Sequence, residues 1–358
     1  MTEKQKNQLK ELVQKTVEEF AWFDDDRTNP GIVLFTEQPS YEIYQKTVHS
    51  LVTIQETENV LTDQAYWFSQ YKNKRGLIGA TAAVAWRPLQ DFTYELITYR
   101  EKTRWGTDRE VDDTSVQSID KHTTKTFDNY DYTHHHNRIV PHSPCPILFG
   151  IRGDDHEELF AAMKLVKAEP RAGWLLFQTN QGTDNHLQPC TIEEIQPYYS
   201  VQVEGIVETQ PYTIAGGHVL FSIRDATGTI DCAAYEPTKE FRNRIRCLQP
   251  GDTVSVCGGV RKVPLTVNIE KIQVLHLQHI KEKIENPVCP LCGKHMKSRG
   301  KDQGFKCVNC KTTSQQPVMS DLKREVKEGW YEVPVCARRH LSKPLKRMKK
   351  ENVVIETV

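Results

Sequence analysis

The sequence lacks several features that would place it in familiar classes of protein. No run approaches the roughly 18 apolar residues that a membrane-spanning helix needs. The first 20 residues are charged and amphipathic, without the apolar core of a signal peptide. No stretch matches the Walker motif of P-loop nucleotide-binding proteins. These absences predict a soluble, cytoplasmic protein.

The chain also lacks a net charge, because 47 Lys and Arg balance 47 Asp and Glu. The balance hides an asymmetry: residues 281–358 carry 18 basic against 9 acidic side chains, and residues 1–280 carry 29 against 38. A basic module on an acidic body is typical of polyanion binding, although a merely solvated basic tail is the alternative. At 358 residues the chain is too long for one hydrophobic core, so we expect two to four domains.

Four of the ten cysteines are spaced as two zinc-binding pairs. Cys289 and Cys292 form one C-x2-C pair, and Cys307 and Cys310 form the second after a gap of 14 residues. A two-residue spacing lets one tight turn direct two thiolates at the same ion. The other six cysteines are scattered singly, which disfavours a disulfide framework. We therefore predict a zinc ribbon whose ion is structural, because four protein ligands leave no position for a substrate.

The first third of the chain reads as mixed helix and strand. Residues 31–35 (GIVLF) predict a buried strand, and residues 40–54 predict a helix with Ser40 as its N-cap. Residues 24–26 are three aspartates before a turn, which we interpret as a solvated loop in preference to a magnesium site. The histidines of residues 134–136 are consecutive and cannot all face one ion, so an exposed loop is the favoured interpretation.

Two places offer candidate substrate contacts. Lys74, Arg75, Gly76 and Gly79 begin a small-residue helix whose free N–H groups could hold phosphate, although an Ala-rich helix packed against a sheet is an equal alternative. The second place follows two apolar strands, residues 147–153 and 174–179, which flank a predicted helix. If the strands are parallel, their following loops meet where α/β sheets bind ligands. These loops carry Arg152, Thr179, Asn180 and Asp184.

From residue 199 the pattern changes to short alternating strands. Five strands over about 80 residues, with a helix at residues 241–248 before the fourth, have the order of an OB-fold barrel. Such barrels bind single strands through aromatic and basic side chains, and the candidates are Phe221, Arg224, Tyr235 and Arg261. Residues 336–350 add seven Lys or Arg and no acid. We predict a nucleic-acid arm there that includes Arg338, Arg339 and Lys343.

Several of these segments, taken in order, resemble the archaeal tRNA(Ile) 2-agmatinylcytidine synthetase family. They are KRGLIGA, TYELITYR, PHSPCPILFGIRG, QTNQGTDNH, GGHVLFSIRDATG, the C-x2-C pairs and RRHLSKPLKR. The resemblance implies a ligase that uses ATP, with Mg²⁺, to attach agmatine to the wobble cytidine of the CAU-anticodon isoleucine tRNA.

The resemblance also implies an α+β multidomain fold. Its parts would be an incomplete kinase-like α/β region (1–142), a ferredoxin-like region (143–198), an OB-fold (199–280), a zinc ribbon (281–335) and a basic tail (336–358). Lys74, Arg75 and Arg152 are the catalytic candidates, and Gly76, Gly79, Thr179, Asn180 and Asp184 are candidates for ATP or substrate binding.

The sequence departs from the family at its start. Family members begin with a strand and an I-D-D-T-D-S-like loop, and nothing similar precedes Met1. A split enzyme, a misplaced start and a remnant that only binds RNA would each explain this departure. We therefore expect either a ligase, active whole or with a companion chain carrying that loop, or a tRNA-binding protein without catalysis. Retention of KRGLIGA and TNQGTDNH favours the ligase.

Overall fold

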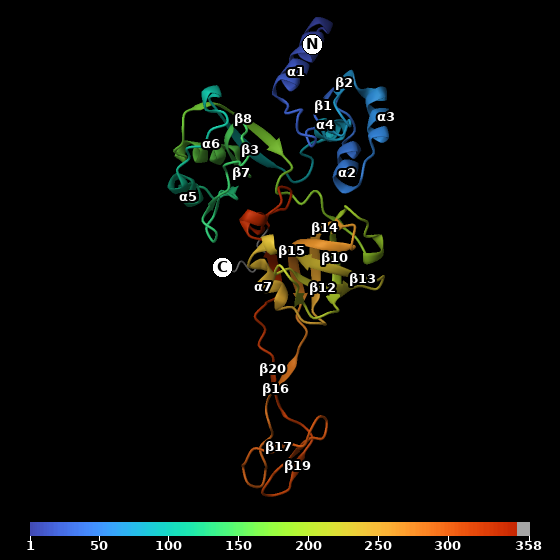
Figure 1. Ribbon diagram of the computed structural model, residues 1–358, viewed down its shortest axis with the longest axis vertical. Helices are drawn as coiled ribbons and strands as arrows, with labels where there is room; N and C mark the ends of the chain where they lie inside the picture. Colours follow the sequence, from blue (N-terminus) through green and yellow to red (C-terminus); the bar gives the residue numbers. More distant parts are fainter. Residues whose placement is uncertain (349–358) are drawn as a thin grey trace.

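The computed structural model describes residues 1–348. Figure 1 shows four parts: a helical N-terminal region and an α/β sheet unit side by side, a barrel beneath them, and a small module that extends away from the barrel. This arrangement confirms the expected α+β multidomain fold with an OB-type barrel and a zinc ribbon. No helix in the described residues combines the length and apolar character needed to cross a membrane.

The N-terminal region is a two-stranded antiparallel sheet covered by short helices. Strand β1 forms where the GIVLF segment predicts it, and the Ser40 hydroxyl caps the following helix by accepting from Glu42 N–H. Val33, Leu61 and Leu77 form its small core. The elements are α1 (Glu3–Phe20), β1 (Gly31–Leu34), α2 (Tyr41–His49), α3 (Ile54–Gln64), β2 (Trp67–Gln70) and α4 (Gly76–Ala85).

The sheet unit has strand order β4-β7-β3-β8 and every neighbouring pair is antiparallel. Strands β7 and β8 therefore run in the same direction, one on each side of β3. The two strands are parallel although they do not pair with each other, so the loops that follow them leave the sheet at the same edge. Their carboxyl ends meet at Tyr94, which pairs with Gly153 and Gln178. The elements are β3 (Thr93–Arg100), α5 (Asp113–His122), β4 (Thr126–Phe127), β5 (Tyr130–Asp131), β6 (His136–Asn137), β7 (Ile147–Gly153), α6 (His156–Leu165) and β8 (Arg171–Thr179).

A closed five-stranded barrel follows, because β10 pairs with both β14 and β12. Alternation along the strands places one face of each in the core, where Val203, Phe221 and Ile272 are buried. Helix α7 lies between the third and fourth barrel strands, as predicted. The elements are β9 (Gln188–Pro189), β10 (Ser200–Val207), β11 (Tyr212–Thr213), β12 (Val219–Arg224), β13 (Thr229–Ala234), α7 (Phe241–Arg246), β14 (Thr253–Arg261) and β15 (Thr266–His276).

The cysteine module is joined to the barrel by a two-stranded stalk, β16 with β20, and contains a small three-stranded sheet. After the stalk the chain returns and adds β21 to the edge of β15, which the sequence did not indicate. The elements are β16 (Lys281–Glu285), β17 (Lys297–Ser298), β18 (Phe305–Lys306), β19 (Thr313–Ser314), β20 (Val318–Asp321), β21 (Gly329–Glu332) and two short 3-10 helices, η4 (Val335–Ala337) and η5 (Leu345–Arg347).

Residues 336–348, the C-terminal strap, run between the barrel and the sheet unit. Backbone N–H groups of Gly182 and Asp184 donate to carbonyl oxygens of His340 and Leu341 over 2.7 and 2.9 Å. Arg347 pairs with Asp91 and Asp154 at 2.8 and 2.6 Å. The strap therefore holds the parts of the molecule together. The predicted tail beyond residue 348 lies outside the described residues.

Arg100 and Glu169 form a buried bidentate ion pair in the sheet unit. Arg100 Nε and Nη2 lie 2.7 and 2.9 Å from the two carboxylate oxygens, and both side chains are almost inaccessible to water. Hydrogen bonds from Arg100 lower the pKa of Glu169, so the charged form of the carboxylate is the stable one.

Replacing Arg100 with Met should destabilise the protein by about 3–5 kcal/mol, because Glu169 then stays buried without its cation. The control is Lys125→Met, which removes the cation of an exposed pair with Asp155 in the same unit and should cost far less, because water screens that pair. Denaturant unfolding measures both free energies. Equal losses would contradict the role assigned to burial.

Candidate active site and nucleic-acid interface

The four predicted zinc ligands converge at the tip of the cysteine module. The Sγ atoms of Cys289, Cys292, Cys307 and Cys310 all lie within 4.8 Å of one another, which suits one tetrahedral ion. Although burial opposes it, backbone N–H groups of Leu291 and Cys292 and the neighbouring thiols lower the pKa of Cys289 to about 6. A thiolate is therefore available at neutral pH. The donor set fits a structural zinc ion.

A charged pocket lies over one face of β3 and β7 and reaches the carboxyl end of β7 at Arg152. Arg152 Nε lies 3.0 Å from Glu95 Oε1, and Gln181 Nε2 donates to Glu95 Oε2 over 2.6 Å. Arg138 and His340 line the same pocket of about 330 Å³. Burial, assisted by the Arg152 charge, lowers the pKa of His340. Two guanidinium groups against one carboxylate leave a net positive pocket that suits an anionic group.

A second pocket of about 370 Å³ lies between α2, α4 and the end of β8. It brings together three of the predicted substrate residues, Gly79, Thr179 and Asn180, against the apolar side chains of Val48, Ala82 and Trp86. Asn180 Nδ2 donates to Tyr44 Oη over 2.8 Å, which ties the loop after β8 to α2. Trp86 lines this pocket, but its Nε1 is buried and has no hydrogen-bond partner within residues 1–348.

The other residues at the start of α4 do not line either pocket. Lys74 Nζ pairs with Glu58 at 2.9 Å. A Cβ atom on Gly76 would lie 2.1 Å from the carbonyl oxygen of Asn29, so this glycine allows α4 to approach the turn before β1. The N–H groups of Leu77 and Ile78 already bond to the carbonyls of Lys74 and Arg75. The geometry favours the packing alternative over the phosphate cradle.

Asp184 and the basic residues of the strap have partners inside the protein. Lys271 Nζ contacts both carboxylate oxygens of Asp184 at 2.7 and 2.6 Å. Arg338 pairs with Asp128 and with Glu332, and Lys343 pairs with Asp91 at 2.8 Å. We expected Asp184 to bind a substrate, and Arg338 and Lys343 to bind RNA. The structure instead pairs each of these charges with an opposite charge inside the protein. Arg339 alone of the three predicted arm residues is exposed, beside Gly259 of the barrel.

The barrel candidates separate into core and surface. Phe221 is 1% exposed and packs inside the barrel, so its ring cannot stack on a base in this conformation. Arg224 is exposed at the end of β12, and Arg261 Nη1 donates to Tyr235 Oη over 3.3 Å on the surface. Tyr198, which sequence reasoning missed, is 60% exposed and its N–H donates to Val260 O, next to Arg261. The feature of the sequence that could have indicated an exposed aromatic side chain here is the Pro-Tyr-Tyr run before the first barrel strand.

Comparison with known families matches three parts of the chain. Residues 74–186 match the description "TiaS FLD domain", residues 201–275 match "OB-fold nucleic acid binding domain", and residues 286–326 match "TiaS C-terminal zinc ribbon domain".

Whole-chain relatives carry one name. A "2-agmatinylcytidine synthetase TiaS" of Methanocaldococcus jannaschii, named for an isoleucine tRNA, is 44% identical over 96% of this chain and 82% of its own length. One of Pyrococcus horikoshii is 40% identical over 98% and 83%. A solved complex of TiaS with this isoleucine tRNA and ATP superimposes with TM-score 0.87 at 42% identity, covering 97% of this chain and 82% of that one. A complex of TiaS with the same tRNA, AMPCPP and agmatine gives 0.83 at 40%, covering 97% and 83%.

Replacing each of the two glycines of α4 with alanine should change the stability of the protein in opposite directions. Gly76→Ala forces a methyl group against the backbone of Asn29 and Pro30 and should destabilise the protein by roughly 1–3 kcal/mol or more. A Cβ on Gly79 meets nothing within 4 Å, so Gly79→Ala should stabilise by about 0.5–1 kcal/mol through helix propensity. Denaturant unfolding of both variants checks the pair. A destabilised Gly79→Ala protein would contradict the open space beside Gly79 in the wall of the pocket.

Proposed function

The chain belongs to the tRNA(Ile) 2-agmatinylcytidine synthetase family, and from this premise we propose that it uses ATP to attach agmatine to the wobble cytidine of the CAU-anticodon isoleucine tRNA. The observation that carries the proposal is the similarity to such synthetases over 96–98% of the chain, including both pockets, the barrel and the ribbon. A tRNA-binding protein without catalysis is not favoured, because a pure RNA binder has no use for two pockets converging on one sheet edge.

The chemistry explains why ATP is required. C2 of cytosine carries a carbonyl oxygen, which is a poor leaving group. Transfer of a phosphoryl group from ATP to that oxygen makes it displaceable. The amine nitrogen of agmatine then forms the C2–N bond, the C2–O bond breaks, and the oxygen leaves on phosphate while the amine loses a proton. Mg²⁺ accompanies the phosphates of ATP and balances their charge.

We assign the anionic part of the substrates to the charged pocket at the sheet edge. Arg138 and Arg152 supply guanidinium groups, and His340 supplies a ring whose pKa is lowered. Fixed cations facing a transferring phosphoryl group stabilise its developing charge without reorganisation. Among the described residues the Arg138 side chain makes no hydrogen bond or ion pair, so this group is free to meet a ligand.

We assign a nucleobase to the pocket between α2, α4 and β8. The Trp86 ring and the methyl group of Ala82 offer apolar surface against a base, and Thr179 and Asn180 offer polar groups. The loop after β8 contributes to both pockets, since Asn180 lines this one and Gln181 holds Glu95 of the other. The two ligand sites are therefore positioned by neighbouring residues.

We assign tRNA binding to the barrel surface around Tyr198, Tyr235 and Arg261, with Arg224 and the ribbon extending it. Aromatic rings beside a guanidinium group are the usual means by which such barrels hold unpaired bases. We also propose that the chain works in the cytoplasm, where tRNA and ATP meet and where its free thiols stay reduced.

The test of this function is mass spectrometry of the wobble cytidine after incubating the chain with the CAU-anticodon tRNA, ATP, Mg²⁺ and agmatine. We expect a gain equal to agmatine less one water. Reactions without agmatine, or with a tRNA that lacks a wobble cytidine, should show none. Arg138→Gln should lower the rate about tenfold, equivalent to one charged contact, while Lys164→Gln on the distant α6 should leave it unchanged. Absence of the gain under saturating substrates would refute activity of this chain alone, and adding a companion chain that carries the aspartate loop would then separate a split ligase from a tRNA-binding protein without catalysis.

Neutralising Arg261 tests the RNA surface separately. Arg261→Gln should weaken tRNA affinity and reduce the slope of log affinity against log salt by about 1, because one phosphate contact is lost. Lys164→Gln provides the matched loss of one positive charge away from the barrel and should change neither quantity. If the salt slope of Arg261→Gln equals that of the wild type, the tRNA does not contact this face of the barrel.

A further inference from the structure

Three side chains with metal-binding donors meet at a place that the proposed reaction does not use. They are Asp131 at the end of β5, His134 in the turn between β5 and β6, and Cys336 in η4 of the strap. The donor atoms all lie within 4.8 Å of one another. Asp131 is 3% exposed and His134 is 23% exposed. The expectation of an exposed loop at residues 134–136 is therefore wrong for His134, which faces inward.

The direction of these contacts separates a metal site from a catalytic relay. In a Cys–His–Asp relay the thiol and the carboxylate address opposite nitrogens of the imidazole. Here Asp131 and Cys336 face the same nitrogen: Nδ1 of His134 lies 3.1 Å from each oxygen of Asp131 and 3.7 Å from Sγ of Cys336. The carboxylate near the opposite nitrogen, that of Glu240, makes no hydrogen bond with it in the described residues, so no relay is assembled. Three donors that converge on one small volume are the arrangement that a cation requires.

The spacing suits zinc in particular. Bonds of about 2.3 Å to sulfur and about 2.0 Å to nitrogen or oxygen at tetrahedral angles place S and N about 3.5 Å apart, and N and O about 3.3 Å apart. The observed 3.7 and 3.1 Å are within a few tenths of an ångström of these values. A mixed set of thiolate, imidazole and carboxylate selects Zn²⁺ over the hard cations Mg²⁺ and Ca²⁺.

The surroundings hold the donors in place. Backbone N–H groups of His134 and Cys336 each donate to Asp131 over 3.0 Å, which fixes the carboxylate between them. On the far side of the imidazole, Nε2 is buried without a hydrogen-bond partner in the described part of the chain, and Oε2 of Glu240 lies 3.3 Å away. A metal on Nδ1 leaves the proton on Nε2, close to this carboxylate, which is the pair of groups that carboxylate–histidine–zinc sites use.

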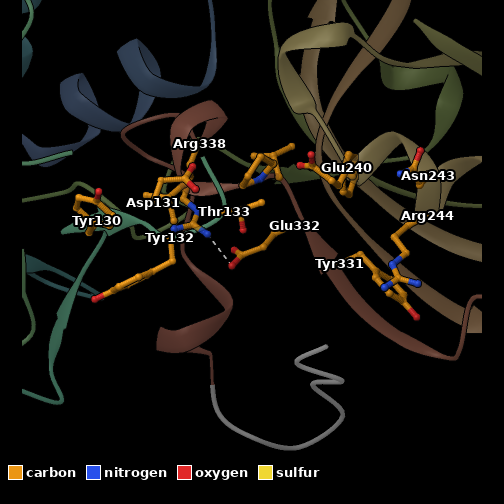
Figure 2. Close-up of a pocket in the computed structure, with 14 residues that line it drawn as sticks. Tyr130, Asp131, Tyr132, Thr133, Glu240, Asn243, Arg244, Tyr331, Glu332 and Arg338 are labelled. Carbon is orange, nitrogen blue, oxygen red and sulfur yellow. Dashed lines mark ion pairs between the residues drawn. The ribbon is translucent and has the colours of Figure 1, made fainter. Parts of the chain in front are cut away.

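Of the three donors, Asp131 lines a cavity of about 560 Å³ at the junction of the sheet unit, the barrel and the strap, and Glu240 lines it too. Figure 2 shows Asp131 and Thr133 on one side of this cavity and Glu240 on another, with the Arg338–Glu332 ion pair nearby. Because Arg338 is already paired, it does not neutralise Asp131. Water from the cavity can supply the remaining ligand of a tetrahedral ion.

We propose that Asp131, His134 Nδ1 and Cys336 bind a second zinc ion, separate from the ribbon, that fastens the β5–β6 hairpin to the C-terminal strap. Glu240 at the start of α7 orients His134 and brings the barrel into the same junction. The ion cross-links segments some 200 residues apart in sequence, so it fixes the sheet unit against the barrel. This role does not depend on the proposed reaction.

Elemental analysis of the full-length chain after zinc loading and desalting tests the site. We expect about two zinc ions per chain, one in the ribbon and one at the junction. Cys336→Ser should leave about one, whereas Cys190→Ser, which alters a half-buried thiol elsewhere, should leave about two. The double substitution Cys307→Ala/Cys310→Ala should retain the junction ion and lose the ribbon ion.

A cobalt spectrum keeps the test decisive if Cys336→Ser fails to fold. Co²⁺ bound to the Cys307→Ala/Cys310→Ala protein should give tetrahedral d–d bands with weak thiolate charge transfer, and His134→Gln in that background should abolish them. Wild-type chain that saturates with one zinc ion, or a second ion that survives both Cys336→Ser and His134→Gln, would overturn the proposal.

Discussion

The architecture depends on one buried lysine. Lys271 of β15 is inaccessible to water, and its ammonium group is held by Asp184 of the loop after β8 and by the carbonyl oxygen of Lys343 in the strap. The preceding residue, Glu270, is also buried and pairs with His186 of the same loop at 3.0 Å. Removing one member of such a pair leaves a charge without compensation at a cost of several kcal/mol, so the loop has one stable position on the barrel.

This constraint links the parts of the molecule that act on different portions of the substrate. The loop anchored by Lys271 also carries Asn180 and Gln181, which shape the two pockets at the sheet edge. The barrel that would bind RNA and the sheet edge that would bind small substrates are thus fixed to one another through a segment of a few residues. A long RNA held by the barrel can therefore present a single base at a defined distance from the pockets.

The local features of the sequence predicted the local structure well. Strict alternation identified the five barrel strands, and the C-x2-C spacing identified the zinc ribbon. Alternation could also have placed Phe221 in the core. Val219, Phe221 and Ile223 are every second residue of β12, so they lie on the same face, and that face is buried. What the sequence did not reveal were pairings between distant segments. The addition of β21 to β15 and the ion pairs of Arg338 and Lys343 join residues whose separation hides their contact, so a basic segment that resembles a nucleic-acid arm became an internal strap.

The position of the cysteine module in the chain has a mechanical consequence. The chain leaves the barrel at the end of β15 and returns as β21, which pairs with β15 itself at Val274 and Gly329. The pairing of β15 with β21 therefore holds the two ends of the inserted segment next to each other on the barrel, independently of the cysteine module. Since the entropy of closing a loop grows only logarithmically with its length, the barrel is almost indifferent to what is inserted there. Loss of the ribbon's ion should therefore disturb the cysteine module without unfolding the barrel that carries it.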